Sequence, residues 1–560
     1  MNKTLSLDDQ KLTSIIDADW DYFMEKYPEF ATMMGDNTYN DKLADISEEA
    51  FLEKKDHHNK TLNELEKINH DNLSEDNKLN YLLFKERVLN EIREIDFKGY
   101  LMPLNQMMGV QEEFSRVVEL MPYKKESDYK NYLSRLKAFP KYANQLIELM
   151  RKGLSLGVTT PRPAIIKVVD QIRDQLPADY KESVYYIPVK NSTNLNESLK
   201  KEIETVLEND FFPAFRRIAD FLEIEYVPNT RLKESLSEVP NGKAYYDHKL
   251  RTSTTTDLTA QEVHDIGLSE VARILKELQN SYKNTGFEGS YEEFLKDLKV
   301  NTQHHFASPK ELMMTYRDIA KRADKELPRF FKVLPRLPYG VEEIPHHQAP
   351  SYPTAYYLPP DLTMTRAGIF YANTSELTTR PNYEAEALTL HEAVPGHHLQ
   401  IALSYEVENI PKFRRMADYI GYIEGWGLYS EKLGEDMGFY KDPYAKFGQL
   451  SFEMWRACRL VIDTGLHALG WSREKSINYL QETTGKSPEA CTVEIDRYIS
   501  IPGQATAYKI GELKILELKQ KFIDAKKEDF DIREFHDVIL RNGALPLNIL
   551  EQYVTDYLNN

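Results

Sequence analysis

The sequence predicts a mostly α-helical protein with a small β patch near residues 340–375. Three observations lead to this expectation. Apolar residues recur at spacings of three and four through most of the chain, as in 129–154. Seven prolines fall between Pro335 and Pro360, where no long helix can form. A short aromatic and β-branched segment then runs from Arg366 to Asn373 and is typical of a strand.

The amphipathic pattern begins near residue 8 and continues to about 225. Proline, glycine and polar clusters near Pro161, Lys190 and Val239 predict connections between helices. We expect an N-terminal helical region over 1–230 and a catalytic region over 231–560, packed together as one helical body.

A helix is expected after Pro381, because strong helix formers follow it and acidic residues occupy its first turn. His391 and Glu392 should lie on this helix. Helical patterns resume at Pro411 and continue to the end of the sequence.

Two further segments have structural interpretations. Thr259 should start a helix, with Glu262 at the capping-box position. Asp463 and His467, four residues apart on a helix, could bind a peptide terminus, but we favour a buried hydrogen-bonded pair.

Composition excludes several classes of function. The 71 Lys and Arg against 89 Asp and Glu give a net charge of −18, and 41% of the residues are hydrophobic. An acidic, folded chain does not favour nucleic acid or an anionic membrane, since phosphate contact needs a basic surface. Its two cysteines, Cys458 and Cys491, cannot form a disulfide framework. Any metal site must use His and carboxylate ligands.

The sequence contains no run of 18 apolar residues, so we expect no membrane span. Its first residues lack the apolar core of a signal peptide. A cytoplasmic location is therefore the default expectation, although an export signal that has been removed would leave the same picture.

The sequence HEAVPGHHLQ, which starts at His391, combines several residues that can bind a metal. In a zincin helix, two His one turn apart bind one zinc, and the Glu beside the first orients the attacking water. Here Pro395 stands where the second His would be. On an unbroken helix, His397 would lie about 120° around and about 9 Å along from His391, too far to share an ion. We therefore expect an interruption of the helix at Pro395 and Gly396.

His398 competes with His397 as the second ligand. On a continuous helix His398 would lie on the face of His391 but about 10.5 Å away. We favour His397, because two residues looped out before it would restore the one-turn relation. The structural alternative is a His-rich helix end, whose imidazoles interact with the helix dipole without a metal. We favour the metal, because His-Glu is followed by Gly-His-His within eight residues, after a predicted strand and helix start.

A tetrahedral catalytic zinc takes a third protein ligand and keeps one position for water. Glu424 and Glu431 lie two turns apart on one face of a predicted helix. We expect Glu424 to be the ligand, because Gly425 and Gly427 beside it permit close helix approach. Glu431 would then hold a ligand imidazole through its other nitrogen. The alternative for each is a solvated surface glutamate.

Peptide hydrolysis also needs hydrogen-bond donors aimed at the oxyanion that forms at the scissile carbonyl. The segment 496–513 supplies Arg497, Gln504 and Tyr508 around a Pro-Gly break. We prefer Tyr508 as the oxyanion donor and expect Arg497 and Gln504 to bind substrate, with Arg497 able to neutralise a substrate carboxylate. The alternatives are a tyrosine of the core, one of 35 in the chain, and an arginine paired with an acidic neighbour.

With these motifs the chain resembles the bacterial domain-of-unknown-function family eight-eight-five, which is similar to the gluzincin metallopeptidases. The resemblance extends over nearly the whole chain and includes MPLNQMMGVQ, LRTSTTTDLTAQEVHDIGL, RLVIDTGLHALGW and RYISIPGQATAYKIGEL. More distantly, GHHLQ and YIEGWGLYSE are similar to the zinc-binding segments of oligopeptidases related to thimet oligopeptidase and neurolysin.

The distant resemblance aligns His397 with the second zinc His and Glu424 with the zinc Glu. It implies a mostly α, cleft-containing, zincin-like fold with the active site on a central pair of helices. The segment with Tyr508 aligns with a tyrosine-rich substrate segment. The chain departs from that group by two extra residues before Gly396.

We therefore expect a zinc metallopeptidase that holds one zinc ion through His391, His397 and Glu424. Glu392 would take a proton from the attacking water and pass it to the leaving amine, and Tyr508 would support the oxyanion. The expected partners are short or unstructured peptides, cut from one end as by a carboxypeptidase or dipeptidase.

The strand from Gly368 to Tyr371 could pair with an extended substrate, which makes Tyr371 a further substrate-binding residue. Two other functions fit the same residues: a zinc hydrolase of a non-peptide amide, and a peptide-binding protein without catalysis. Glu392 speaks against pure binding, which needs no base. The sequence gives no indication of the oligomeric state.

Overall fold

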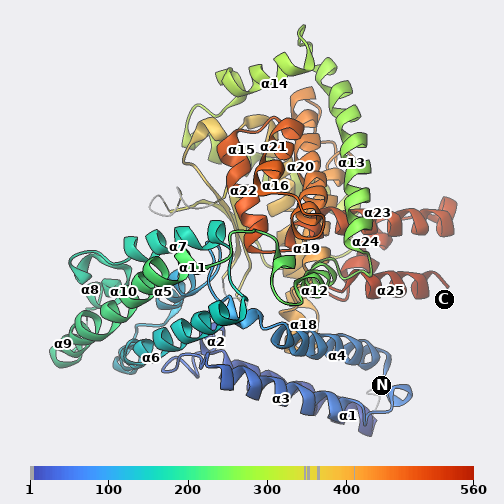
Figure 1. Ribbon diagram of the computed structural model, residues 1–560. Helices are drawn as coiled ribbons and strands as arrows, with labels where there is room; N and C mark the ends of the chain where they lie inside the picture. Colours follow the sequence, from blue (N-terminus) through green and yellow to red (C-terminus); the bar gives the residue numbers. More distant parts are fainter. Residues whose placement is uncertain are drawn as a thin grey trace. The chain divides into compact units, whose positions relative to one another are not determined.

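The computed structural model describes residues 6–193, 195–345, 349, 353–361, 366–408 and 410–559. The chain forms two compact units, the first comprising 1–245 with 411–413 and the second 246–410 with 414–560 (Figure 1). This division falls after residue 245, whereas the boundary expected from the sequence, at residue 230, stays a prediction. The following segment still belongs to the first unit, where Tyr245 stacks on Phe97 and donates a hydrogen bond to Glu94.

The first unit consists of helices. They are α1 (Leu7–Lys26), α2 (Pro28–Met33), α3 (Glu48–Leu65), α4 (Glu75–Asp96), α5 (Val110–Leu120), α6 (Glu126–Leu156), α7 (Arg162–Asp174), α8 (Ile187–Lys190), α9 (Glu197–Val206), α10 (Phe212–Phe221) and α11 (Val227–Asn229). The expected connections are present, since Pro161 precedes α7 and Lys190 ends α8.

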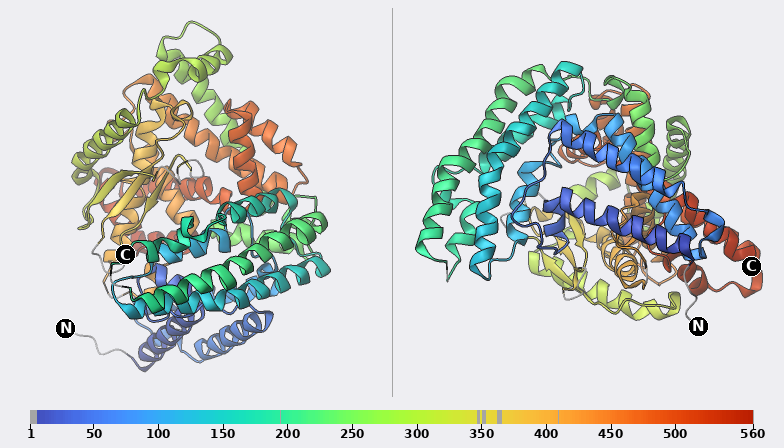
Figure 2. Two further views of the ribbon diagram at one scale, coloured as in Figure 1. Left: turned by 90° about the vertical axis from the view of Figure 1, so that its left-hand side faces the viewer. Right: turned by 90° about the horizontal axis from the view of Figure 1, so that it is seen from below.

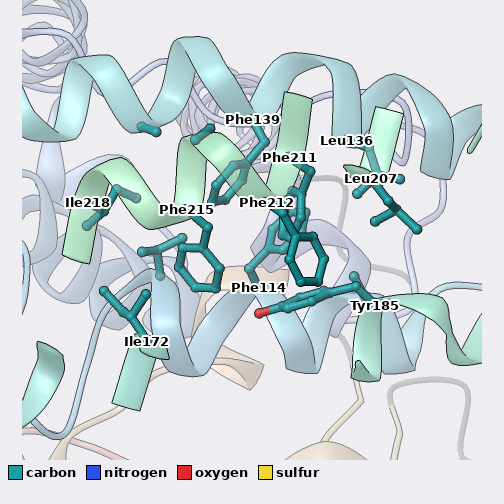
Figure 3. Close-up of a cluster of buried hydrophobic side chains, with 14 of the residues drawn as sticks. Phe114, Leu136, Phe139, Ile172, Tyr185, Leu207, Phe211, Phe212, Phe215 and Ile218 are labelled. Atoms are coloured by element: carbon teal, nitrogen blue, oxygen red, sulfur yellow. The ribbon is translucent and has the colours of Figure 1, made fainter. Parts of the chain in front are cut away.

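An aromatic core fills the first unit between α5, α6, α7 and α10 (Figure 3). Phe211 lies at its centre, with its ring 4.5 Å from that of Phe139 and 4.7 Å from that of Tyr185. Tilted and edge-on ring pairs of this kind add to the free energy gained by burying apolar area. The expected amphipathic helices thus turn their apolar faces inward.

The second unit carries the remaining helices and the strands. They are α12 (Gly242–Thr254), whose first residues belong to the first unit, α13 (Ala260–Ser281), α14 (Tyr291–Val300), α15 (Pro309–Phe330), β1 (Tyr339–Glu343), β2 (Ala355–Leu358), β3 (Gly368–Ala372), α16 (Ala385–Glu392), α17 (His397–Glu406), α18 (Lys412–Arg415), α19 (Ile420–Leu433), α20 (Pro443–His467), α21 (Arg473–Thr484), α22 (Pro488–Ser500), α23 (Ala507–Lys526), α24 (Ile532–Leu540) and α25 (Leu547–Asn559). Thr259 and Glu262 form the predicted capping box of α13.

The β patch is a three-stranded sheet in the order β1-β3-β2 (Figure 2, left). β3 pairs in parallel with β1 and antiparallel with β2. Residues 346–348, 350–352 and 362–365 of the expected patch lie outside the described residues. The mostly α fold with one small sheet is confirmed.

Two helices of the second unit, α19 and α23, touch backbone to backbone. A Cβ atom at Gly425 would lie 2.5 Å from Cα of Gly511, and a Cβ at Gly511 would collide with the carbonyl of Gly421. Only glycine permits this approach. The contact fixes α19, which carries Glu424, against α23, which begins one residue before Tyr508.

A buried ion cluster holds α23 in its orientation. The ammonium group of Lys509 is fully buried and lies 2.7 Å from Glu453 on α20 and 2.6 Å from Glu512 on its own helix. Breaking a buried pair leaves an uncompensated charge, so rotation of α23 is strongly disfavoured. The neighbouring Tyr508 is therefore held at a fixed position.

Among the helices that the structure describes, none combines the length and the apolar character needed to cross a bilayer.

We predict that Gly511→Ala destabilises the protein, although alanine is the better helix former. The helix propensity gain is about 1 kcal/mol, whereas overpacking against a rigid backbone costs about 1–3 kcal/mol and separates α19 from α23. The denaturation midpoint in urea measures the difference. Gly340→Ala is the matched control, because its Cβ would meet nothing closer than 3.6 Å. Equal midpoints for the two variants would show that α19 and α23 have room to separate.

Candidate metal centre

The helix that starts at Ala385 is interrupted where the sequence predicts. α16 ends at Glu392 and α17 begins at His397, with a cis peptide bond between Val394 and Pro395. The indole nitrogen of Trp426 on α19 donates a 2.8 Å hydrogen bond to the carbonyl of Pro395. The break is therefore tied to the helix that carries Glu424.

This break brings the two imidazoles together. The ring centroids of His391 and His397 lie 4.6 Å apart at an interplanar angle of 83°. Oε2 of Glu424 lies 3.3 Å from Nε2 of His391 and 3.5 Å from Nε2 of His397. The three predicted ligands thus offer one donor atom each to a common point, and all three donor atoms lie within 4.8 Å of one another.

The spacing suits a tetrahedral zinc ion. Ligand atoms about 2.1 Å from a shared ion in tetrahedral geometry lie about 3.4 Å from one another. The two distances to Glu424 bracket this value. Oε2 of Glu424 is buried without a hydrogen-bond partner among the described residues, as expected for an atom that serves a cation. Two imidazoles and a carboxylate are also a donor set that zinc accepts.

His398 is engaged elsewhere. Its Nδ1 accepts a 2.9 Å hydrogen bond from the hydroxyl of Tyr357 on β2, and its Nε2 donates a 3.1 Å hydrogen bond to the carbonyl of Leu337. Burial lowers the pKa of His398 to about 4, although the carbonyl partially opposes this shift. A neutral ring with both nitrogens in use is not free to bind a metal, and the geometry supports His397.

Glu431 makes the contact that the sequence predicts. Its Oε1 accepts a 2.8 Å hydrogen bond from Nδ1 of His391, and it is fully buried. This bond fixes the ring so that Nε2 faces Glu424. Gly427 lies between the two glutamates on α19, and a Cβ there would come within 2.6 Å of the His391 ring. Because Gly427 has no side chain, the imidazole of His391 can pack directly against α19.

Glu392 ends α16 beside the ligands and is 9% exposed. Burial raises the pKa of its carboxyl group, and the imidazoles of His397 and His391 oppose this shift. For His391, burial alone would lower the pKa, but Glu424 and Glu431 raise it to about 9. Burial likewise opposes ionisation of Glu424, yet the two imidazoles hold its pKa well below the usual range. The group attracts a positive charge, which a proton or a metal ion can supply.

The predicted substrate residues form one network beside Glu424. Nη1 of Arg497 donates a 2.8 Å hydrogen bond to Oε1 of Gln504, whose side chain in turn contacts Tyr508. Burial, with Glu424 next, raises the pKa of Tyr508 in spite of two nearby arginines. The phenol therefore keeps its proton and can donate a hydrogen bond, as an oxyanion partner must.

Sequence reasoning missed two arginines of α20. The guanidinium carbon of Arg459 lies 4.4 Å from the ring centroid of Tyr508, and Nη2 of Arg456 lies 3.6 Å from Oε1 of Glu431. Both side chains are buried. The available signal was the spacing in WRACRLVI, because two arginines three apart in an otherwise buried helix must face polar partners.

Asp463 and His467 anchor the loop that carries Gln504. Asp463 accepts hydrogen bonds from the hydroxyl of Tyr246 at 2.7 Å and from the backbone N–H of Gly503 at 3.0 Å. His467 contacts the carbonyl of Tyr498 through Nε2 at 3.1 Å. The expected burial of both side chains is confirmed, and these hydrogen bonds join each of them to other residues.

The expected pairing of substrate with β3 is wrong. β3 is the middle strand and is hydrogen-bonded along both edges, so no edge is open to a peptide. Gly368 lies on the face that meets Tyr357 and His398. Because side chains alternate along a strand, Tyr371 lies on the opposite face, where its ring stacks on Tyr356. A substrate role for Tyr371 stays a prediction without support from the sheet.

A second group of possible metal ligands lies in the first unit, where the sequence predicts none. Asp19, His57 and His58 offer donor atoms within 4.8 Å of one another. However, Asp19 uses both of its oxygens. Oδ1 lies 2.9 Å from Nε2 of His57, and Oδ2 lies 3.2 Å from Nη1 of Arg87. The guanidinium already supplies the positive charge, so this group is a buried ion network.

Comparison with curated proteins finds no match. Among solved structures, one from Colwellia psychrerythraea named a "putative lipoprotein" is 26% identical, with a TM-score of 0.94 over 99% of this chain and 100% of that chain. Another from Shewanella oneidensis, a "putative lipoprotein of unknown function", is 15% identical, with a TM-score of 0.77 over 98% and 100%. The second likeness concerns the fold alone.

The resemblance inferred from the motifs is confirmed at the level of the family. The model of the family described as bacterial protein of unknown function, DUF885, matches residues 28–554, and the chain therefore belongs to this family.

Proposed function

We propose that this protein is a zinc-dependent metallopeptidase that hydrolyses short or unstructured peptides as an exopeptidase. One observation carries the proposal: Oε2 of Glu424 lies 3.3 Å from Nε2 of His391 and 3.5 Å from Nε2 of His397, the spacing of neighbouring ligands of a tetrahedral zinc ion. Glu392 lies next to this group in the sequence and in space. Metal ligands with an adjacent free carboxylate are the minimum set for metal-assisted hydrolysis.

The bound zinc ion would polarise the scissile carbonyl and lower the pKa of the attacking water. Glu392 would accept a proton from that water and deliver it to the leaving amine as the C–N bond breaks. Tyr508 would donate its phenolic proton in a hydrogen bond to the oxyanion. Glu431 would hold His391 in the tautomer that leaves Nε2 free.

The limited exposure of the ligand side chains favours small substrates. The side chains of His391, His397 and Glu424 are 4%, 11% and 18% exposed, so a folded protein surface could not reach them. An extended chain of a few residues could. Cleavage near one end of such a chain is the activity that this burial favours.

The default expectation of a cytoplasmic location stays a prediction. The solved structure from Colwellia psychrerythraea is named a putative lipoprotein, which speaks against that location. Fractionation of cells that express the protein distinguishes a cytoplasmic location from a location outside the cytoplasm.

We predict that His397→Ala loses zinc whereas His398→Ala keeps it. The first change removes a donor atom from the set, while the second removes only the hydrogen bonds to Tyr357 and Leu337, at a cost of about 1–3 kcal/mol in stability. Elemental analysis of each purified variant measures zinc per chain. The same zinc content in both variants, or loss of zinc from His398→Ala alone, would show that His397 is not the second ligand.

We predict that Glu392→Gln keeps zinc and loses about 10²–10⁴-fold in kcat/KM for peptides, because glutamine cannot accept a proton. Mass spectrometry of a mixed peptide library with the zinc-loaded protein gives the substrates for this comparison. Glu435→Gln is the control, since that half-exposed side chain forms an ion pair with Lys446 on the surface.

Turnover that is unchanged in Glu392→Gln would rule out the proposed base. Cleavage of non-peptide amides in place of peptides would keep the zinc site but change the substrate. A zinc-free protein that turns over peptides at the same rate as the loaded one would contradict the proposal as a whole.

A further inference from the structure

Two arginines close to Tyr508, the buried Arg459 and the partly exposed Arg497, each carry one buried N–H donor without an acceptor among the described residues. Arg459 on α20 is 6% exposed, and its Nη1 is buried with no hydrogen-bond partner in the described part of the chain. The same holds for Nη2 of Arg497 on α22. Buried donors are almost always paired in native proteins. Two such atoms on neighbouring arginines therefore call for an acceptor from outside the chain.

The internal partners leave a surplus of positive charge. Oε2 of Glu494 lies 3.4 Å from Nη2 of Arg459 and 3.5 Å from Nε of Arg497. The other contacts are neutral: Nε of Arg459 donates to the Tyr498 hydroxyl at 3.1 Å, and Nη1 of Arg497 donates to Gln504 at 2.8 Å. One carboxylate thus serves two guanidinium groups, at distances too long for a bidentate pair. A second anion would complete the charge balance.

The arginine pair lies next to the candidate metal centre. The ring of Tyr508 is 4.4 Å from the guanidinium carbon of Arg459, and the charges of Glu424, Arg459 and Arg497 all affect the pKa of its hydroxyl group. Arg456, one helical turn before Arg459, reaches Glu431 behind His391. A metal ligand and the arginine pair are therefore neighbours of one phenol, an arrangement that suits one short peptide bound to both.

We propose that Arg459 and Arg497 bind the free C-terminal carboxylate of the substrate, so that the protein removes one or two residues from the C-terminal end of peptides. This inference rests on the proposed peptidase function. A guanidinium group matches a carboxylate with two parallel N–H donors, and two such groups can hold both oxygens. With the carboxylate held there, the preceding one or two residues extend about 3.5–7 Å toward His391 and His397.

The reaction is an ordinary hydrolysis and needs no co-reactant. The oxygen of water bonds to the carbonyl carbon, the C–N bond breaks, and a proton passes to the amine that leaves with the C-terminal residue or dipeptide. The number of residues released reports how far the arginine pair lies from the metal along the bound peptide.

Binding of matched peptides to the zinc-loaded Glu392→Gln protein tests the inference directly. Two peptides of the same sequence are compared by calorimetry, one with a free C-terminal acid and one with a C-terminal amide. We expect the acid to bind at least about tenfold tighter, as for a charge-assisted pair in a buried site. A third peptide, an amide with an internal Asp, distinguishes a terminal carboxylate from a side-chain carboxylate and should bind as weakly as the plain amide.

The variants assign the preference to its residues. Arg459→Gln and Arg497→Gln should each lower the acid-to-amide ratio of Kd values toward one, Arg459→Lys should retain part of it, and Glu494→Gln should raise it by freeing the pair. Arg329→Gln, an exposed arginine of α15, is the control and should leave the ratio unchanged. Thermal unfolding and zinc content of each variant show that it is folded, and any variant that is not folded is replaced by its lysine counterpart.

Kinetics with the wild-type zinc-loaded protein separate the two proposals. Cleavage of acid and amide peptides at equal rates, or tighter binding of the amide with internal Asp, would leave a peptidase but overturn the carboxylate site. Cleavage of neither peptide would overturn the proposed function, and the calorimetric ratio would still decide for or against the arginine pair. Release of N-terminal residues from the free acid would also contradict the inference.

Discussion

The close approach of α19 to its neighbours is the constraint on which the candidate site depends. Gly425 lets α19 touch the backbone of α23 at Gly511, and Gly427 lets the ring of His391 lie against the same helix. Glu424 is placed between these two contacts. A side chain at either position would push α16 or α23 away, and the ligand atoms would separate by more than a shared ion allows.

The break between α16 and α17 is also needed to bring the three ligand atoms together. A continuous helix would turn His397 away from His391, whereas the segment 393–396 lets the chain restart with both imidazoles facing Glu424. Trp426 links this segment to α19 through the carbonyl of Pro395. Ligand spacing and helix packing are thus set by the same few residues.

Charge explains why such a group persists in a buried position. Glu424 and Glu431 lie against His391, and Glu392 is next to it, all within the protein interior. Carboxylates removed from water cost several kcal/mol each unless a cation compensates them. Around Arg459 and Arg497 the sign of the charge is reversed, since these two arginines share the one carboxylate of Glu494. A bound cation at the first group and a bound carboxylate at the second would balance both.

Much of the fold could be predicted from the sequence, because helix periodicity and turn residues are local signals. The strand at β3, the capping box at Thr259, the break at Pro395 and the contact of Glu431 with His391 all follow from short segments. The choice of His397 over His398 also follows, since the spacing in a helix limits which side chains can meet.

The remaining features depend on contacts between distant segments. The order of the strands shows that no peptide can pair with β3, the strand of Tyr371. The strand sequences alone do not show which strand lies in the middle. Arg459 and Arg497 share Glu494 only because α20 and α22 pack together, so the spacing in WRACRLVI indicates that the α20 arginines have polar partners but does not show which ones. The Asp19 network in the first unit escaped notice for the same reason.

The central claim is that His391, His397 and Glu424 hold one zinc ion. An anomalous difference map from crystals of the zinc-loaded protein, recorded at the zinc absorption edge, tests it most directly. We expect a single strong peak about 2.0–2.2 Å from Nε2 of both histidines and from a carboxylate oxygen of Glu424. Absence of a peak there, or a peak at Asp19 and His57 alone, would contradict the assignment.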